Sequence, residues 1–263
     1  MRYKLAEDAK PQLALLLLAT VITVILWFLP FTEYLVYPIR LFVTFIHEAS
    51  HALVSFITGG SVQSLTISPD GSGVVYSASP GVFSALLTSS AGYLGTTAFG
   101  VLLLLLIRKS VSSQKILLFA GGFIGIITLF FGVLMPAFNI FSLQVSFLTV
   151  LFTIVSGALL AAGLVVLAAY SSPKVANFAV AFLAVQCLLN ALSDLKTLFF
   201  INASFGGSEI QTDAGNMANA TGLPSIMWVL IWMGISILMI SFGLRLYAVA
   251  KSRAAQQDLP FED

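Results

Sequence analysis

Long apolar segments dominate this chain and leave few folds open to it. Of its 263 residues, 59% are hydrophobic and 9% are charged, whereas soluble domains carry about 25% charged residues. A water-facing surface cannot be built from so few charges, so lipid is the expected solvent for most of the chain. A helix needs about 20 mostly apolar residues to span a bilayer. Seven segments meet that length: 11–30, 34–58, 81–107, 116–135, 145–170, 175–201 and 225–249.

The predicted fold is therefore an all-α polytopic membrane protein of about seven transmembrane helices. We expect one helical bundle over residues 1–250, followed by a charged C-terminal tail at 251–263. The connection at 61–79 differs from the others, because alternating apolar residues flank the turn-forming sequence Pro69-Asp70-Gly71-Ser72-Gly73. This pattern predicts a short β-hairpin between the second and third helices. Glycines and other small residues within the helices are explained by close helix packing.

Charge and cysteine content exclude some classes of function. The net charge is +1, and no cluster of basic and aromatic residues suggests a nucleic-acid surface. The single cysteine, Cys187, cannot form a disulfide within the chain. The expected surroundings are a lipid bilayer, without nucleic acid.

The two histidines of the chain form a motif that carries chemistry. His47 and His51 enclose Glu48 in the sequence His-Glu-Ala-Ser-His, inside the second apolar segment. Residues four apart on an α-helix point to the same side. Metallopeptidases bind Zn²⁺ with such a pair and use the glutamate as general base. Zinc lowers the pKa of its bound water to about 7. The motif therefore predicts a Zn²⁺ site at His47 and His51, with Glu48 as the catalytic residue that activates the zinc-bound water.

The position of the motif within an apolar helix strengthens this prediction. Ionisable groups surrounded by lipid cost a few kcal/mol unless they are paired, and they are usually functional. The alternative is a hydrogen-bonded polar cluster without a metal. Arg40, Thr44 and Ser55 continue the polar face of the motif at helical spacings. This face is expected to line the bundle interior or a water-filled cavity, because hydrolysis consumes water.

A catalytic zinc takes three protein ligands, and a carboxylate is the natural third one because no histidine remains. Asp194 lies in the sixth apolar segment and shares a helix face with Gln186 and Asn190. The second and sixth segments run in the same direction, so Asp194 and the histidines are expected near the same membrane face. Asp194 is therefore the predicted third ligand. Asp213 follows on that face and is the competing ligand, and Asp194 can instead pair with Arg40.

These residues resemble the M50 family, the site-2 protease class of intramembrane metallopeptidases, and specifically its M50B-like branch. The resemblance implies a zinc-dependent endopeptidase that cuts a membrane-embedded protein substrate. It also implies that His47, His51 and Asp194 bind the metal and that Glu48 is the general base. It covers about residues 46–224 and rests on the following stretches: His-Glu-Ala-Ser-His-Ala-Leu, Gly59-Gly60, the turn at 69–73, Ala91-Gly92-Tyr93-Leu94-Gly95, Asp194-Leu195 and Thr212-Asp213-Ala214.

The flanks of Asp194 depart from that family pattern. Better-studied members carry the third ligand after Asn-Pro and before Gly, whereas Ser193 and Leu195 flank Asp194 here. A non-proteolytic membrane protein, such as a transporter or scaffold that keeps the metal site, is therefore the alternative function. A membrane metal hydrolase acting on lipid is a third candidate, but the expected hairpin favours a peptide, which it can align by strand addition. The distribution of Lys and Arg and the resemblance imply opposite orientations, so the orientation stays open.

Overall fold

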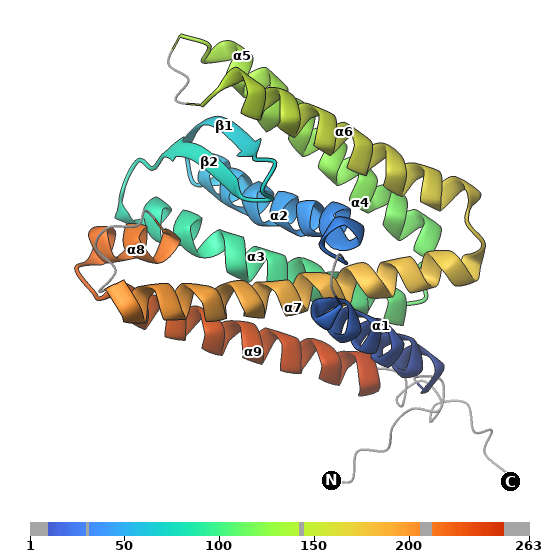
Figure 1. The fold of residues 1–263 in the computed structure, drawn as a ribbon. Coiled ribbons are helices and arrows are strands. Elements are labelled where there is room, and N and C mark those ends of the chain that lie inside the picture. Colours follow the sequence, from blue (N-terminus) through green and yellow to red (C-terminus); the bar gives the residue numbers. More distant parts are fainter. Residues whose placement is uncertain (1–9, 30–31, 142–144, 206–211, 250–263) are drawn as a thin grey trace, which may run out of the picture.

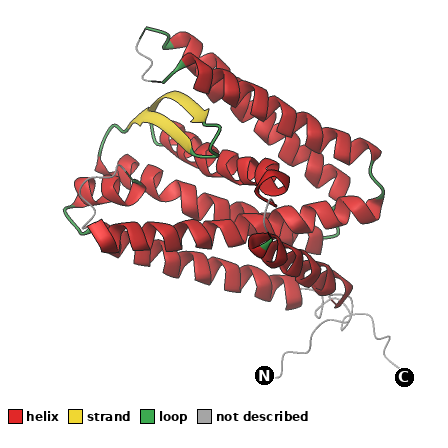
Figure 2. Cartoon of the chain, in the orientation of Figure 1, coloured by secondary structure: helices red, strands yellow, loops and turns green. Residues whose placement is uncertain are grey.

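The computed structural model describes residues 10–29, 32–141, 145–205 and 212–249. All seven segments predicted as helices are helical in it (Figures 1 and 2). The predicted tail at 251–263 lies outside the described residues. The seven helices are α1 (Lys10–Phe28), α2 (Thr32–Ile57), α3 (Val82–Arg108), α4 (Ser113–Ile127), α6 (Phe147–Tyr170), α7 (Pro173–Phe205) and α9 (Ser225–Val249). A π-helical stretch, η2 (Thr128–Leu134), and the short helix α5 (Met135–Phe138) continue α4.

The protein is a multi-pass integral membrane protein, but the predicted count of seven spans is not confirmed. Among the described residues, five helical stretches are long and apolar enough to cross a bilayer: Val82–Arg108, Ser113–Phe138, Phe147–Tyr170, Pro173–Ala203 and Ser225–Ala248. The apolar part of α1, Leu13–Leu26, is shorter. Helix α2 falls outside this set because Arg40 and the motif residues His47, Glu48 and His51 lower its hydropathy.

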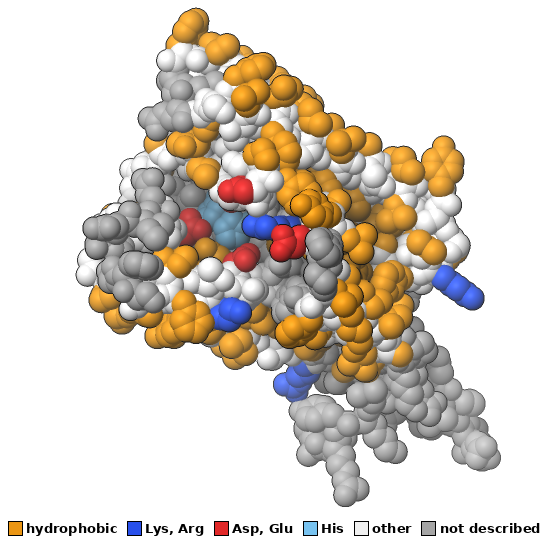
Figure 3. Space-filling view, viewed as in Figure 1, with side chains coloured by type: hydrophobic (Ala, Val, Ile, Leu, Met, Phe, Trp, Pro, Cys, Tyr) orange, Lys and Arg blue, Asp and Glu red, His pale blue; other side chains and the backbone are white. Residues whose placement is uncertain are grey.

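Helix α3 occupies the middle of the bundle. It packs against α2, α7 and α9, while α4 packs against α6 and α7 (Figure 1). One apolar core runs through α1, α2, α3, α4, α6 and α7, and a second lies where α3, α7, α8 and α9 meet. Hydrophobic side chains also cover much of the outer surface (Figure 3), as lipid-facing helices require.

The predicted hairpin is confirmed. Strand β1 (Ser61–Ile67) pairs with β2 (Gly73–Ala78) in antiparallel register, with Ser61 opposite Ala78 and Ile67 opposite Gly73. The turn between them contains Gly71, whose φ of 83° lies in the left-handed region that glycine adopts without strain.

The polar face of α2 holds the turn of the hairpin. The Tyr37 hydroxyl donates a hydrogen bond to the carbonyl oxygen of Pro69 at 2.6 Å. The Thr44 hydroxyl donates to the carbonyl oxygen of Gly71 at 2.9 Å. The N-terminal half of α2 therefore fixes the point from which β2 starts.

The two edges of the hairpin have different surroundings. On β1, the amide of Ile67 donates to Thr153 Oγ1 of α6 at 2.8 Å, and the same hydroxyl contacts the Ile67 carbonyl oxygen at 3.2 Å. Within the described part of the chain, β2 pairs with β1 alone, and residues 74–77 of β2 line a cavity. The hairpin is thus held to the bundle through β1 and offers the edge of β2.

A helix that the sequence analysis did not predict, α8 (Asp213–Thr221), follows α7. Its N-cap is Thr212, whose hydroxyl accepts a hydrogen bond from the amide of Gly215 at 3.0 Å. It ends at Gly222, which has a left-handed φ of 72°. Asp213 therefore occupies the first position of a helix, where the positive end of the helix dipole favours a carboxylate.

Replacing Thr153 with valine tests whether α6 anchors β1. The change preserves shape but leaves the buried Ile67 amide without its partner, which costs about 1–3 kcal/mol. We expect Thr153→Val to lower the melting temperature of the purified protein in detergent. The matched control is Thr20→Val, because among the described residues the Thr20 hydroxyl bonds only within its own helix, to the carbonyl oxygen of Leu16. Equal melting temperatures for the two variants would contradict the anchor.

Candidate metal centre

A cavity of about 820 Å³ opens between the hairpin and helices α2, α3, α7 and α8. Figure 3 shows histidine at the bottom of this hollow, with acidic side chains beside it. Its wall includes His47, Glu48, His51, Asp194 and Asp213, and no lysine or arginine lines it among the described residues. All of the candidate site residues named from the sequence therefore face one space.

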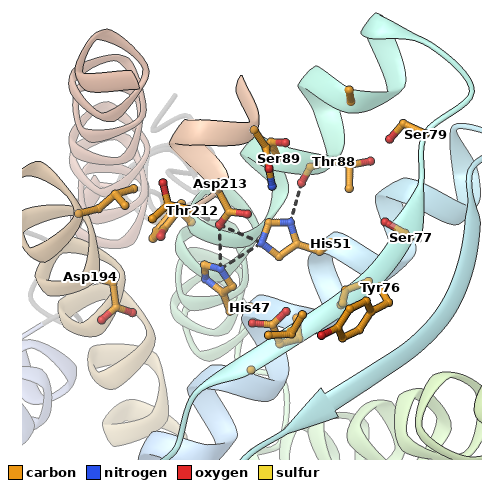
Figure 4. A pocket seen from close by; sticks show the side chains of 18 of the residues that line it. His47, His51, Tyr76, Ser77, Ser79, Thr88, Ser89, Asp194, Thr212 and Asp213 are labelled. Carbon is orange, nitrogen blue, oxygen red and sulfur yellow. Dashed lines mark hydrogen bonds and ion pairs between the residues drawn. The ribbon is translucent and has the colours of Figure 1, made fainter. Parts of the chain in front are cut away.

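Two imidazoles and one carboxylate converge in this cavity (Figure 4). The Nε2 atoms of His47 and His51 are 3.1 Å apart. Asp213 Oδ2 lies 3.6 Å from Nε2 of His47 and 3.3 Å from Nε2 of His51. The centre of a triangle with these sides is about 1.9 Å from each corner, so the three atoms are close enough together for one zinc ion, which binds such ligands at about 2.0–2.2 Å. These three residues can hold a metal ion.

The orientation of His51 suits a metal ligand. Its Nδ1 lies 2.6 Å from the backbone oxygen of Thr88 on α3. Because a carbonyl oxygen only accepts, Nδ1 must carry the proton. When Nε2 is deprotonated, as metal binding requires, its lone pair faces the space that Asp213 Oδ2 and His47 Nε2 also face. The hydrogen bond at Nδ1 holds the ring in that orientation.

Asp213 has the charge that a metal ligand needs. Burial acts to raise the pKa of its carboxyl group, but the imidazoles of His51 and His47 outweigh burial and hold that pKa below its usual range. The helix N-terminus at Thr212 favours the same ionised form.

Two glycines allow the backbone to approach the motif closely. A Cβ atom built on Gly92 of α3 would clash with Nε2 of both His47 and His51. A Cβ atom on Gly73, the first residue of β2, would lie 2.8 Å from Glu48 Oε1. The sequence analysis assigned such glycines to helix packing, but Gly92 keeps open the space in front of the two imidazole nitrogens. A glycine at this position carries no sequence signal that separates the two roles.

Asp194, the third ligand expected from the sequence, lies in the same cavity but outside the group of converging ligand atoms. Figure 4 shows it on α7, apart from Asp213 and the two imidazoles. Among the described residues it forms no ion pair with Arg40 within 4.0 Å, although the two interact electrostatically. The geometry therefore favours the competing residue, Asp213. The reason is α8, which packs on α3 and carries Asp213 to the histidines.

The other polar residues on the face of α7 that Asp194 was expected to share precede it in the helix, and they have a packing role. Gln186 donates a hydrogen bond to the Thr23 hydroxyl of α1 at 3.0 Å. Asn190 donates to Gln186 Oε1 at 3.0 Å. These side chains join α1 to α7 instead of extending the metal site.

Comparison with known families agrees with the motif. The model of the family described as Peptidase M50B-like matches residues 16–243. This match covers most of the chain, so the protein belongs to the Peptidase M50B-like family. No curated protein and no solved structure matches the chain.

Replacing Gly92 with alanine tests the metal centre without changing a ligand. Its methyl group would occupy the space in front of the Nε2 atoms of His47 and His51. We expect the metal content of purified Gly92→Ala to fall from one ion per chain to a small fraction of an ion per chain. Inductively coupled plasma mass spectrometry measures this content. Gly122→Ala is the control, because nothing lies within 4 Å of a Cβ atom there. Full metal content in Gly92→Ala would show that the ion sits elsewhere.

Proposed function

We propose that this member of the Peptidase M50B-like family is a zinc-dependent intramembrane endopeptidase that hydrolyses a peptide bond of a membrane-embedded protein. The observation that carries the proposal is the convergence of His47, His51 and Asp213 on one point, with Glu48 in the same cavity. A polar cavity in a bundle with an apolar exterior can hold water, which peptide hydrolysis consumes.

In the proposed site, His47, His51 and Asp213 hold the ion. Two imidazole nitrogens and one carboxylate oxygen are a donor set that catalytic zinc sites use, with a fourth position left for water. When bound, the ion supplies a Lewis acid that polarises the substrate carbonyl and lowers the pKa of water to about 7. Asp194 remains the alternative third ligand.

Glu48 is the proposed general base. It accepts a proton from the attacking water as the water oxygen bonds to the carbonyl carbon of the substrate. It then returns the proton to the amide nitrogen as the carbon–nitrogen bond breaks. One peptide bond and one water become a carboxylic acid and an amine, and transfer of the acid proton to the amine leaves a carboxylate and an ammonium group. The close approach of Gly73 limits the space that the Glu48 side chain can take.

The edge of β2 supports a peptide substrate in preference to a lipid. A transmembrane helix satisfies its backbone hydrogen bonds internally, so the bond to be cut must first leave the helix. An extended peptide can pair with an available strand edge, and residues 74–77 of β2 line the cavity that contains the histidines.

The non-proteolytic alternative loses its motivation if Asp213 is the ligand. It rested on Ser193 and Leu195, which flank Asp194 in place of the family residues. If Asp194 does not bind the ion, its neighbours say nothing about the metal site.

Matched substitutions separate the two candidate third ligands. We expect Asp213→Asn to lose most of the bound metal, because it removes a ligand charge from the convergent group. We expect Asp194→Asn to keep one ion per chain, because its carboxylate lies outside that group. Metal content and zinc affinity, measured on both purified variants, check this. The reverse result would restore Asp194 as the ligand.

Replacing Glu48 with glutamine tests the reaction. Glutamine cannot accept the proton, so we expect cleavage to fall at least about 10²-fold while the metal stays bound. The assay uses the full chain in lipid nanodiscs with a pool of single-span reporter helices, each containing a Gly-Ser break. Reactions run in H₂¹⁸O, and mass spectrometry detects ¹⁸O in the new carboxylate.

The control for this experiment is His47→Ala, which should lose both metal and cleavage. Equal cleavage by wild type and Glu48→Gln would refute the assigned base. Metal-loaded wild type that cleaves no reporter, and no membrane protein in cells that produce it, would favour the non-proteolytic alternative.

A further inference from the structure

A tyrosine outside the sequence motif lies against the metal centre. Tyr93 follows Gly92 on α3 and lines the cavity. Its ring packs edge-on against His47, with 4.7 Å between ring centroids and 84° between ring planes. The phenol group is therefore beside one of the proposed ligands of the ion.

The ring of Tyr93 also packs against a second aromatic side chain. Trp232 of α9 stacks on it, with a centroid distance of 5.5 Å and an interplanar angle of 25°. Trp232 is 1% exposed, and its Nε1 donates a hydrogen bond to the Ser90 hydroxyl at 3.0 Å. His47 and Trp232 thus both pack against the ring and limit its movement.

The hydroxyl of Tyr93 has no hydrogen-bond partner in the part of the chain that the structure describes. Tyr93 is 9% exposed, and among the described residues its hydroxyl forms no hydrogen bond. It is also not among the fully buried side-chain atoms of that part of the chain that lack a hydrogen-bond partner. A fully buried hydroxyl without a hydrogen-bond partner would lower the stability of the fold by about 1–3 kcal/mol. The small accessible part of Tyr93 therefore includes its hydroxyl, and Tyr93 is one of the residues that line the cavity.

The surroundings of this hydroxyl define what it can bind. The carboxylates of Asp213, Asp194 and Glu48 all act on it electrostatically, so it lies within the charged part of the cavity. A phenol hydroxyl can donate one hydrogen bond. Its natural partner is an acceptor that enters with the substrate.

We propose that Tyr93 is a further catalytic residue of this site, whose hydroxyl donates a hydrogen bond to the carbonyl oxygen of the scissile peptide bond. This inference rests on the proposed function. As the water oxygen bonds to the carbonyl carbon, the carbonyl π electrons move onto its oxygen, and Tyr93 stabilises the resulting charge. The carbonyl re-forms when the carbon–nitrogen bond breaks, and Tyr93 keeps its proton throughout. A fixed donor aimed at developing charge is among the largest contributions to catalysis.

The competing role for Tyr93 is packing, in which the ring only positions His47. Tyr93→Phe separates the two roles, because it keeps the ring between His47 and Trp232 and removes only the unpaired hydroxyl. A packing role predicts normal turnover for this variant, whereas a donor role predicts a loss confined to the transition state.

The experiment measures cleavage of the reporter helices by wild type and by Tyr93→Phe. We expect kcat to fall about 10²–10³-fold, the usual cost of one oxyanion donor, with KM and metal content unchanged. A peptidyl phosphinate, which mimics the tetrahedral transition state, should bind the variant more weakly by a similar factor. Tyr170→Phe is the matched control, because Tyr170 is 86% exposed at the end of α6.

Each result decides the inference. Unchanged kcat and unchanged phosphinate affinity in Tyr93→Phe would overturn it and leave the peptidase proposal intact. Loss of metal in Tyr93→Phe would assign the residue to positioning His47 and would also overturn it. If metal-loaded wild type cleaves no reporter while Glu48→Gln behaves identically, the proposed function fails and the inference fails with it.

Discussion

The convergence of His47, His51 and Asp213 is the interaction on which the rest of the site depends. Charged and polar groups in a lipid-surrounded bundle need partners, because lipid cannot solvate them. The site meets this need from three elements, since α2 supplies the imidazoles, α3 supplies the Thr88 carbonyl and α8 supplies the carboxylate. These polar contacts, together with apolar packing, therefore fix the positions of the three helices relative to one another.

Glycine makes that convergence possible. A side chain at position 92 would collide with both imidazole nitrogens, and one at position 73 would press on Glu48. At these two positions the backbone itself lies next to the motif, because glycine has no side chain to fill the space. In membrane helices, small residues usually permit close helix contact. Here the same property leaves room for an ion between helices, so packing and function are not separate explanations for these positions.

The sequence was sufficient where the signal is local. Apolar length predicted the seven helices, alternation predicted the hairpin, and four-residue spacing predicted that His47 and His51 share a face. It failed to separate Asp194 from Asp213, because that choice depends on how the segment after α7 folds back. The signals for α8 were present in Thr212, Gly222 and Pro224, a helix cap and two stop residues. The span count is unconfirmed for two reasons. The apolar part of α1 is short, and the polar residues of α2 lower the hydropathy by which spans are recognised.

An intramembrane peptidase must bring an extended peptide and water to the same place within lipid. The hairpin links these requirements, since β2 begins at Gly73 against Glu48 and its next residues form the cavity wall. In the proposed reaction, a peptide that pairs with β2 would lie next to the base that activates water. Because β1 is bonded to α6 and the turn is bonded to α2, the strand edge cannot shift without moving those contacts. The placement of the substrate relative to Glu48 is then determined by the same hydrogen bonds that hold the fold.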